Sequence, residues 1–259
     1  MTHTGNTRLA GVMGWPVKHS RSPLLHGHWL ARHGIDGAYV PLAVAPENFA
    51  AALTALPQLG FRGTNITVPH KQSALALLDE IGEIDEDARR IGAVNTVVVG
   101  EDGRMRGSNT DAFGFMENIR DQAPDWQADA GSRDRDDALA KEYNAVFGNR
   151  IVVSDWQQRA DVLAEANGLV NSTSLGMEGQ PPLELDLARL PAKSLVNDIV
   201  YAPLETKMLQ NANKCPLNVV DGLGMLLHQA RPGFAAWFGT EPVVDDELRQ
   251  VVLRDLGVS

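Results

Sequence analysis

The sequence predicts an α/β protein built from two domains. Short apolar stretches rich in β-branched residues alternate with amphipathic helical stretches over residues 9–91, and the alternation resumes over residues 151–220. This pattern is typical of parallel sheets flanked by helices. A polar, loop-like stretch at residues 122–131 is expected to be a surface excursion, and 259 residues suffice for one large or two modest domains.

The first half carries clear signals for the ends of its elements. Strands are expected at residues 9–15, 39–44, 63–68 and 93–99. A hairpin turn at residues 101–103 follows the last of them. Helices are expected at residues 23–33, 46–56, 69–81 and 84–91. Proline opens the first three because its ring fits the first helical turn.

The second half repeats the alternation. Strands are expected at residues 151–153, 168–173, 194–200 and 217–220. Helices are expected at residues 134–143, 156–166, 223–238 and 245–256. Pro232 should kink the third of these helices, and we expect the last one to return to the first half of the chain.

Composition limits the classes of partner. The net charge of −10 argues against nucleic acid and against an anionic membrane surface. The single cysteine, Cys215, excludes an internal disulfide and offers no metal cluster. His26 and His28 are two residues apart, so a helix would point them to different faces and no metal site is expected there. The start of the chain has no apolar signal-peptide core, and we expect a soluble, cytoplasmic protein.

Lys71 is the first candidate for chemistry. It follows the strand at residues 63–68 and Pro69, which fixes the point where strand gives way to helix. An ammonium at such a junction can project into a cleft and exchange a proton with a ligand hydroxyl. The alternative is an ordinary solvated lysine in a first helical turn, and the position alone leaves both readings open.

Asp111 is the second candidate. It follows Asn109 and Thr110 and immediately precedes an apolar period that begins at Phe113. Aspartate is a preferred helix N-cap, so capping alone would explain it, and it could also serve both purposes.

Six segments together resemble the shikimate dehydrogenase family. They are residues 19–23 (HSRSP), 65–71 (NITVPHK), 92–96 (GAVNT), 109–111 (NTD), 171–177 (NSTSLGM) and 221–229 (DGLGMLLHQ). The resemblance implies an α/β substrate domain, residues 1–110 with 240–259, and a Rossmann-like, doubly wound NADP domain, residues 111–239. It also implies reversible NADPH-dependent reduction of 3-dehydroshikimate to shikimate, a step in chorismate and aromatic amino acid biosynthesis.

The same resemblance implies roles for individual residues. Lys71 would be the acid/base and Asp111 its carboxylate partner. Ser20 and Ser22 would bind the substrate carboxylate. Further substrate contacts would come from Thr67, Asn95, Tyr201 and Gln229. Cofactor contacts would come from Arg135, Thr173, Ile199 and Gly222.

One part of the family pattern is missing. The second domain of the family opens with a strand, a glycine-rich loop that holds the pyrophosphate, and a helix. Here Gly131 passes directly to Ser132, so about 30 residues, one βαβ unit, are absent. Arg135 would then belong to what remains of a 2′-phosphate clamp, although a surface arginine at a helix start is the alternative.

Three explanations of the missing unit stay open. The natural chain carries a segment that this sequence omits, the segment was removed by design, or the protein is a paralogue that binds substrate without dinucleotide. The functional alternatives are accordingly a quinate/shikimate dehydrogenase, which could use NAD, and a non-catalytic binder of shikimate-like acids. The apolar C-terminal helices could form core or a homodimer interface.

Overall fold

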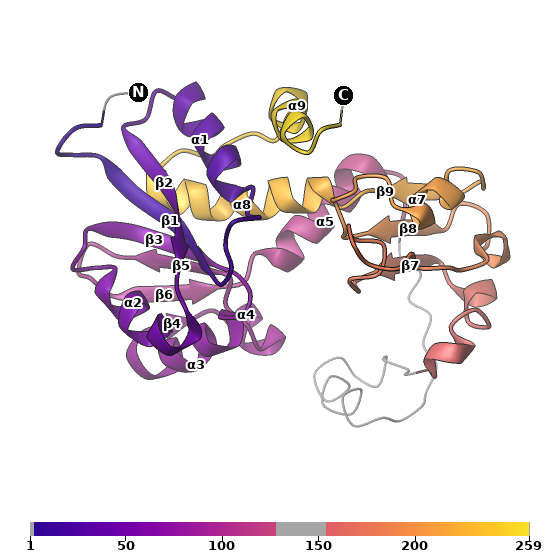
Figure 1. Ribbon diagram of the computed structural model, residues 1–259, viewed down its shortest axis with the longest axis horizontal. Coiled ribbons are helices and arrows are strands. Elements are labelled where there is room, and N and C mark those ends of the chain that lie inside the picture. Colours follow the sequence, from indigo (N-terminus) through magenta and orange to yellow (C-terminus); the bar gives the residue numbers. More distant parts are fainter. Residues whose placement is uncertain (1–2, 128–153, 259) are drawn as a thin grey trace. The chain divides into compact units, whose positions relative to one another are not determined.

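The computed structural model describes residues 3–127 and 154–258, and the chain forms two compact units (Figure 1). The first unit comprises Met1–Met116 and Gly224–Ser259, and the second comprises Glu117–Leu223. These boundaries differ from the expected ones at residues 110 and 239. Residues 224–239 belong to the first unit, for a packing reason given below.

A sheet of six strands forms the centre of the first unit, in the order β2-β1-β3-β5-β6-β4. The strands are β1 (Arg8–Gly14), β2 (Gly37–Ala43), β3 (Phe61–Ile66), β4 (Glu83–Ile84), β5 (Thr96–Val99) and β6 (Met105–Ser108). Strand β1 runs parallel to β2 and β3, but β5 runs antiparallel to β3 and β6. The sheet is therefore mixed rather than parallel, because β5 runs opposite to the other five strands.

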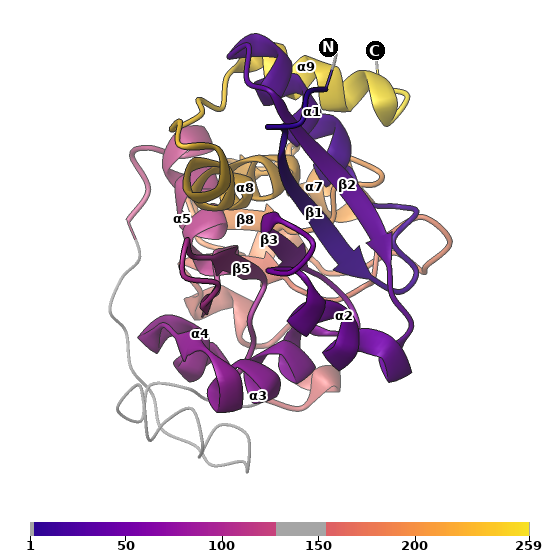
Figure 2. The same ribbon diagram turned by 90° about the vertical axis from the view of Figure 1, so that its left-hand side faces the viewer.

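Helices cover both faces of this sheet (Figures 1 and 2). On one face lie α2 (Phe49–Ala55), α3 (Lys71–Ile81) and α4 (Glu86–Ile91), and on the other lie α1 (Ser22–Arg32) and α8 (Leu223–Phe238). Leu53, Leu78 and Val97 are fully buried between the sheet and the first set. Helix α4 begins later than expected, because Ile84 belongs to β4 and Asp85 caps the helix by accepting the Ala88 N–H.

Helix α8 belongs to the first unit because its C-terminal half is buried there. Phe234 and Trp237 are almost fully buried, and the Trp237 indole N–H donates to the Val97 carbonyl at 3.0 Å. Gly63, with φ of 149°, makes room for this indole, since a Cβ at that position would lie 2.2 Å from its nitrogen. The helix spans residues 223–238 as predicted, and it contains Pro232.

The C-terminal helix α9 (Asp246–Asp255) packs on α1, so the chain returns to its first half as predicted. An ion pair at 2.5 Å joins Arg21 to Asp255, and the Trp29 indole donates to the Val243 carbonyl at 3.0 Å. Leu248 and Val252 are fully buried. The apolar faces of these C-terminal helices are thus core within the chain.

Among its described residues, the second unit contains a parallel sheet of three strands, β7 (Gly168–Asn171), β8 (Leu195–Asp198) and β9 (Asn218–Val220), in that order. Its helices are α7 (Lys207–Ala212) and the 3-10 turns η2 (Trp156–Gln158), η3 (Leu163–Glu165) and η4 (Leu187–Arg189). The continuous helix expected at residues 156–166 was therefore wrong. Trp156 and Val162 stay about half exposed, so the segment lacks the apolar stripe that would hold a helix on the core.

Some predictions lie outside the described residues: the helix at residues 134–143, the strand at residues 151–153, and Arg135. Helix α7 was not expected from the sequence. None of the helices in the described part of the chain has the length and apolar character that a membrane span requires.

Candidate active site

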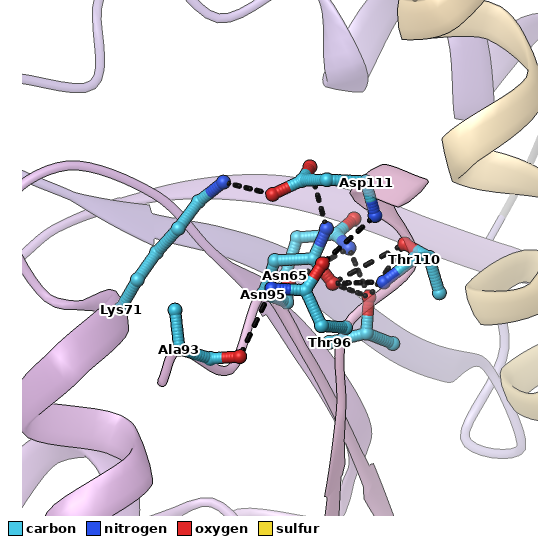
Figure 3. Close-up of polar contacts among 8 residues, drawn as sticks. Asn65, Lys71, Ala93, Asn95, Thr96, Thr110 and Asp111 are labelled. Carbon is cyan, nitrogen blue, oxygen red and sulfur yellow. Dashed lines mark hydrogen bonds and ion pairs between the residues drawn. The ribbon is translucent and has the colours of Figure 1, made fainter. Parts of the chain in front are cut away.

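Lys71 is the first residue of α3, and the backbone around it is fixed on several sides. The chain leaves β3 at Ile66, and the Thr67 N–H donates to the Met13 carbonyl at 2.9 Å. The Lys71 carbonyl accepts the Val94 N–H at 3.0 Å. The lysine side chain is 30% exposed and ends in an ion pair with Asp111, Nζ to Oδ2, at 2.6 Å (Figure 3). The ammonium is therefore held next to a carboxylate while one side stays open to solvent.

Asp111 is the first residue of α5 (Asp111–Gln122), and its two carboxylate oxygens have different partners. Oδ2 accepts from Lys71, and Oδ1 accepts from the Asn95 amide at 2.8 Å (Figure 3). Its backbone N–H donates to the Asn109 side-chain oxygen at 2.9 Å. The carboxylate lies at the positive end of the helix dipole, but side chains occupy both of its oxygens. Helix capping alone does not account for this arrangement.

Asn95 supports the pair from a buried position, with 4% of its surface exposed. Its side-chain oxygen accepts the Thr110 backbone N–H and the Thr96 hydroxyl, each at 2.9 Å. Because two donors hold that oxygen, the amide NH₂ must point the other way, toward Asp111. Asn95 thereby fixes the carboxylate in the orientation that faces Lys71.

Asn65 is a member of this network that the sequence reasoning missed. Its amide NH₂ donates to the Asn95 carbonyl at 3.2 Å and to the Thr96 hydroxyl at 3.0 Å, and its side-chain oxygen accepts from the Tyr39 hydroxyl at 2.6 Å. A signal was available, since residues two apart in an extended chain share a face. That rule places Asn65 beside Thr67, which the sequence reasoning did name.

Ser20 and Ser22 lie together at the start of α1, both partly exposed. The Ser22 N–H donates to the Ser20 hydroxyl oxygen at 3.3 Å. Tyr39 lies behind them and is almost fully buried. Burial raises the pKa of the Tyr39 phenol well above its usual range, and a hydrogen bond from Ser22 lowers it to a smaller extent. The tyrosine therefore stays protonated, as a donor.

Thr67 and Gln229 lie in the same unit, on the loop after β3 and on α8. Gln229 contacts α5 one turn after Asp111, where a Cβ added to Gly114 would lie 2.6 Å from the Gln229 Cβ. Seven of the residues expected from the sequence thus belong to the first unit: Ser20, Ser22, Thr67, Lys71, Asn95, Asp111 and Gln229.

The residues expected to contact a cofactor lie in the second unit, where the strands of the parallel sheet end. Thr173 follows β7, and its N–H and hydroxyl both donate to the Asn171 side-chain oxygen, at 3.1 and 2.7 Å. Ile199 follows β8, and Gly222 follows β9. A Cβ on Gly222 would lie 2.4 Å from the Ile199 carbonyl oxygen, so only glycine fits there. Tyr201 lies three residues after β8 and is partly exposed.

This edge of the second sheet is suited to a nucleotide. In open parallel sheets, ligands bind outside the carboxyl ends of the strands. The sequence has no glycine-rich loop of the usual dinucleotide-binding type, so the described residues offer only part of such a site. Among the described residues, no group of three or more His, Cys, Asp or Glu side chains could hold a metal ion.

Comparisons with known proteins agree with the geometry. The family model of the shikimate dehydrogenase substrate binding domain matches residues 12–97. A relative from Rhodospirillum rubrum named shikimate dehydrogenase (NADP(+)) is 54% identical, covering 96% of this chain and 98% of its own. A relative of the same name from Paramagnetospirillum magneticum is 50% identical, covering 96% of this chain and 99% of its own.

Solved structures give the same result. The quinate dehydrogenase from Corynebacterium glutamicum in complex with NAD has a TM-score of 0.83 and 31% identity, covering 96% of this chain and 99% of its own. The shikimate 5-dehydrogenase from Thermus thermophilus in complex with NADP(H) and shikimate has a TM-score of 0.79 and 30% identity, covering 96% of this chain and all of its own.

The alignment to the R. rubrum relative also bears on the missing unit. It extends over 281 positions, whereas this chain has 259 residues. The relative therefore carries residues that have no counterpart here, as the expected loss of a βαβ unit requires. Since the identity exceeds one half over nearly the whole of both chains, this protein belongs to the shikimate dehydrogenase family.

Proposed function

We propose that this chain is an NADP-dependent shikimate dehydrogenase that interconverts 3-dehydroshikimate and shikimate. The observation that carries the proposal is the ion pair of Lys71 and Asp111 at 2.6 Å, held by the buried amide of Asn95. The names of the relatives, shikimate dehydrogenase (NADP(+)), support the choice of substrate and cofactor.

The chemistry follows from the charges of the pair. When bound, NADPH supplies the hydride that reduces the carbonyl. The oxygen then gains negative charge, which the Lys71 ammonium stabilises before it gives up a proton. In the reverse direction, neutral Lys71 accepts the proton of the substrate hydroxyl. Asp111 keeps the lysine in place throughout, because Asn95 holds its other oxygen.

We assign the substrate carboxylate to Ser20 and Ser22. Both serines lie at the N-terminus of α1, where the Ser22 N–H donates to the Ser20 hydroxyl oxygen and where the helix dipole favours an anion. Thr67, Asn95 and Gln229 are proposed to bind the ring hydroxyls, since unmatched buried hydroxyls are unfavourable by about 1–3 kcal/mol each. Tyr201 is proposed as a further substrate contact.

We assign the cofactor to the second unit. The described strands of its parallel sheet are followed by Thr173, Ile199 and Gly222. The close approach of Gly222 to the Ile199 carbonyl requires a residue without a side chain, which supports a site where a ligand can approach the backbone. Arg135 remains a proposal for the 2′-phosphate.

The setting of the enzyme is also a proposal. We expect a cytoplasmic enzyme of aromatic amino acid biosynthesis whose only ligands are small molecules, because the net charge of −10 disfavours nucleic acid and anionic membranes. If a homodimer forms, it uses surfaces other than the buried faces of α8 and α9, and sedimentation velocity would detect it.

Two alternatives have specific support. Activity on quinate with NAD is favoured by the similarity to the quinate dehydrogenase from C. glutamicum, whose TM-score is 0.83. Substrate binding without turnover is favoured by the absent glycine-rich loop and by the alignment that is longer than this chain.

Steady-state rates decide among these functions. The purified chain is mixed with shikimate or quinate and with NADP⁺ or NAD⁺, and the absorbance of the reduced cofactor is followed. We expect the highest kcat/KM with shikimate and NADP⁺, and a large loss in Lys71→Ala. Calorimetric binding of shikimate without any turnover would instead identify a binder. An intact mass near 28.0 kDa would establish that the chain under test lacks the segment.

A further inference from the structure

Tyr39 lies in the first unit, at a point where its hydroxyl meets the network around Asp111. Its ring stacks on His26 with centroids 3.9 Å apart, and its side chain is almost fully buried. The hydroxyl donates to the Asn65 side-chain oxygen at 2.6 Å. Because burial keeps this phenol protonated, the hydrogen bond has a fixed direction.

That direction favours one orientation of each side chain that follows, the same one that the backbone bonds of Asn65 and Asn95 favour. An asparagine whose oxygen accepts from Tyr39 must present its NH₂ on the other side, and Asn65 donates there to the Thr96 hydroxyl at 3.0 Å. Thr96, having accepted this bond, donates its own hydrogen to the Asn95 side-chain oxygen at 2.9 Å. Asn95 then donates to Asp111 Oδ1 at 2.8 Å (Figure 3).

The result is one chain of hydrogen bonds with a single polarity. It runs from the Tyr39 hydroxyl through Asn65, Thr96 and Asn95 to Asp111, where Lys71 binds the second carboxylate oxygen. Asn95 and Thr96 are 4% and 2% exposed, so water does not compete for most of its length. If the amide or hydroxyl of any member were turned round, two donors or two acceptors would face each other.

We propose that Tyr39 is a positioning residue for the reaction: through this hydrogen-bond chain it reinforces the orientation of the Asn95 amide, which the Thr110 N–H also fixes, and with it the Asp111 carboxylate. The inference rests on the proposed function for its kinetic consequence. Tyr39 acts through other side chains, and it is not a catalytic residue.

The test uses two variants that each remove one hydroxyl and keep the packing. Tyr39→Phe retains the ring that stacks on His26, and Thr96→Val retains the shape of the next donor. Thr64→Val is the matched control: its hydroxyl is also fully buried and lies 3.0 Å from the Gly11 carbonyl oxygen and 2.9 Å from the Asn65 backbone carbonyl oxygen, but it bonds none of the side chains of this hydrogen-bond chain.

Each of the two variants should lower kcat by about three- to tenfold, since one hydrogen bond is worth about 0.5–1.5 kcal/mol. The kcat of the double variant should be less than about twofold below that of the less active single variant, because both substitutions break the same hydrogen-bond chain. Thr64→Val should lower the melting temperature without lowering kcat. Unchanged kcat in the two single variants, multiplying losses in the double variant, or an equal loss in Thr64→Val would overturn the proposal. If Tyr39→Phe does not fold, Thr96→Val against Thr64→Val decides.

A second readout separates this inference from the proposed function. If the unaltered chain does not oxidise shikimate, the proposed function fails, and NMR of the Asn95 side-chain amide then tests the hydrogen-bond chain. Its two amide proton signals should be sharp in the unaltered chain and in Thr64→Val, and broadened in Thr96→Val and Tyr39→Phe. Signals unaffected by either substitution would contradict the positioning role, whatever the activity.

Discussion

The ion pair of Lys71 and Asp111 is expected to contribute little to stability and much to the rate of the reaction. Their side chains are 30% and 27% exposed, and an ion pair in such a position contributes only about 0–1 kcal/mol to stability. The same pair is proposed to hold the group that exchanges a proton with the substrate. Loss of the pair should therefore lower kcat much more than it lowers the free energy of unfolding.

Asp111→Asn tests this separation. The substitution keeps the shape of the side chain and removes its charge, so we expect kcat to fall by about tenfold to a hundredfold while the free energy of unfolding changes by less than about 1 kcal/mol. Initial rates and denaturant titrations measure both. Asp79→Asn, which breaks the exposed ion pair with Arg89, is the control and should leave kcat unchanged. A loss of stability that matches the loss of rate would assign the pair a structural role.

His26 gives a prediction about pH. It is fully buried among aromatic rings, and burial lowers its pKa from 6.5 to about 3. Below pH 6.5, His26 binds a proton in the unfolded chain but not in the folded chain. The free energy of unfolding therefore decreases as the pH is lowered, by up to about 1.4 kcal/mol per pH unit, until about pH 3. Between pH 7 and pH 5 this one group should cost the folded state about 2 kcal/mol.

Denaturant titrations of the unaltered chain and of His26→Phe at both pH values isolate the effect. The stability difference between the two proteins should shift by about 2 kcal/mol in favour of the variant at pH 5. The corresponding substitution at the exposed His33 is the control. A difference that does not depend on pH would mean that His26 becomes protonated in the folded chain.

Side-chain identity allowed part of the site to be predicted from sequence. Lys71, Asp111 and Asn95 were named before the structure, and the structure brings them within hydrogen-bond distance of one another. Asn65 was not recognised although its spacing from Thr67 pointed to it. Tyr39 was missed because it lies on β2, which is separated from β3 by β1, and no spacing in the chain indicates that its hydroxyl reaches Asn65.

At the scale of elements, the close packing of α5 against α8 places Asp111. Gly114 is one turn after Asp111, and a Cβ there would lie 2.7 Å or less from both the Gln229 side chain and its backbone nitrogen. The two helices can approach this closely only if that position has no side chain.

Gly114→Ala should therefore move α5 away from α8. We expect a loss of about 1–3 kcal/mol in the free energy of unfolding, as for overpacked cores, and a fall in kcat because Asp111 moves with the helix. Gly27→Ala in α1 is the control: nothing lies within 4 Å of its Cβ, so the alanine should stabilise the protein by about 0.5–1 kcal/mol. Urea titrations compare the two, and equal stability of both variants would contradict the packing argument.

Sequence patterns predicted most strands and helices of the first unit, and their failures have physical causes. The mixed sheet was missed because strand patterns carry no direction, so nothing in the pattern of β5 shows that it runs opposite to its neighbours β3 and β6. Helix α8 was expected in the second domain, whereas it groups with the first unit, because the burial of Phe234 and Trp237 there depends on tertiary packing that the sequence pattern does not show. Residues 156–166 have helical composition but no apolar stripe.

At the scale of the whole molecule, family membership and the missing unit coexist. The match to the R. rubrum relative covers 96% of this chain at 54% identity, and the alignment is still longer than the chain. The sequence pattern places the expected loss in the proposed cofactor-binding part, whereas the candidate substrate residues of the first unit are all present. We expect shikimate binding to be the more robust of the two binding activities.

The most direct test of the central claim is Lys71→Arg. Arginine keeps the positive charge next to Asp111 but does not release a proton near neutral pH. We predict that the variant binds shikimate with little change in calorimetric affinity and forms NADPH from shikimate at least about a hundredfold more slowly than the unaltered chain. Turnover by Lys71→Arg at the unaltered rate would contradict the assignment of the proton to Lys71.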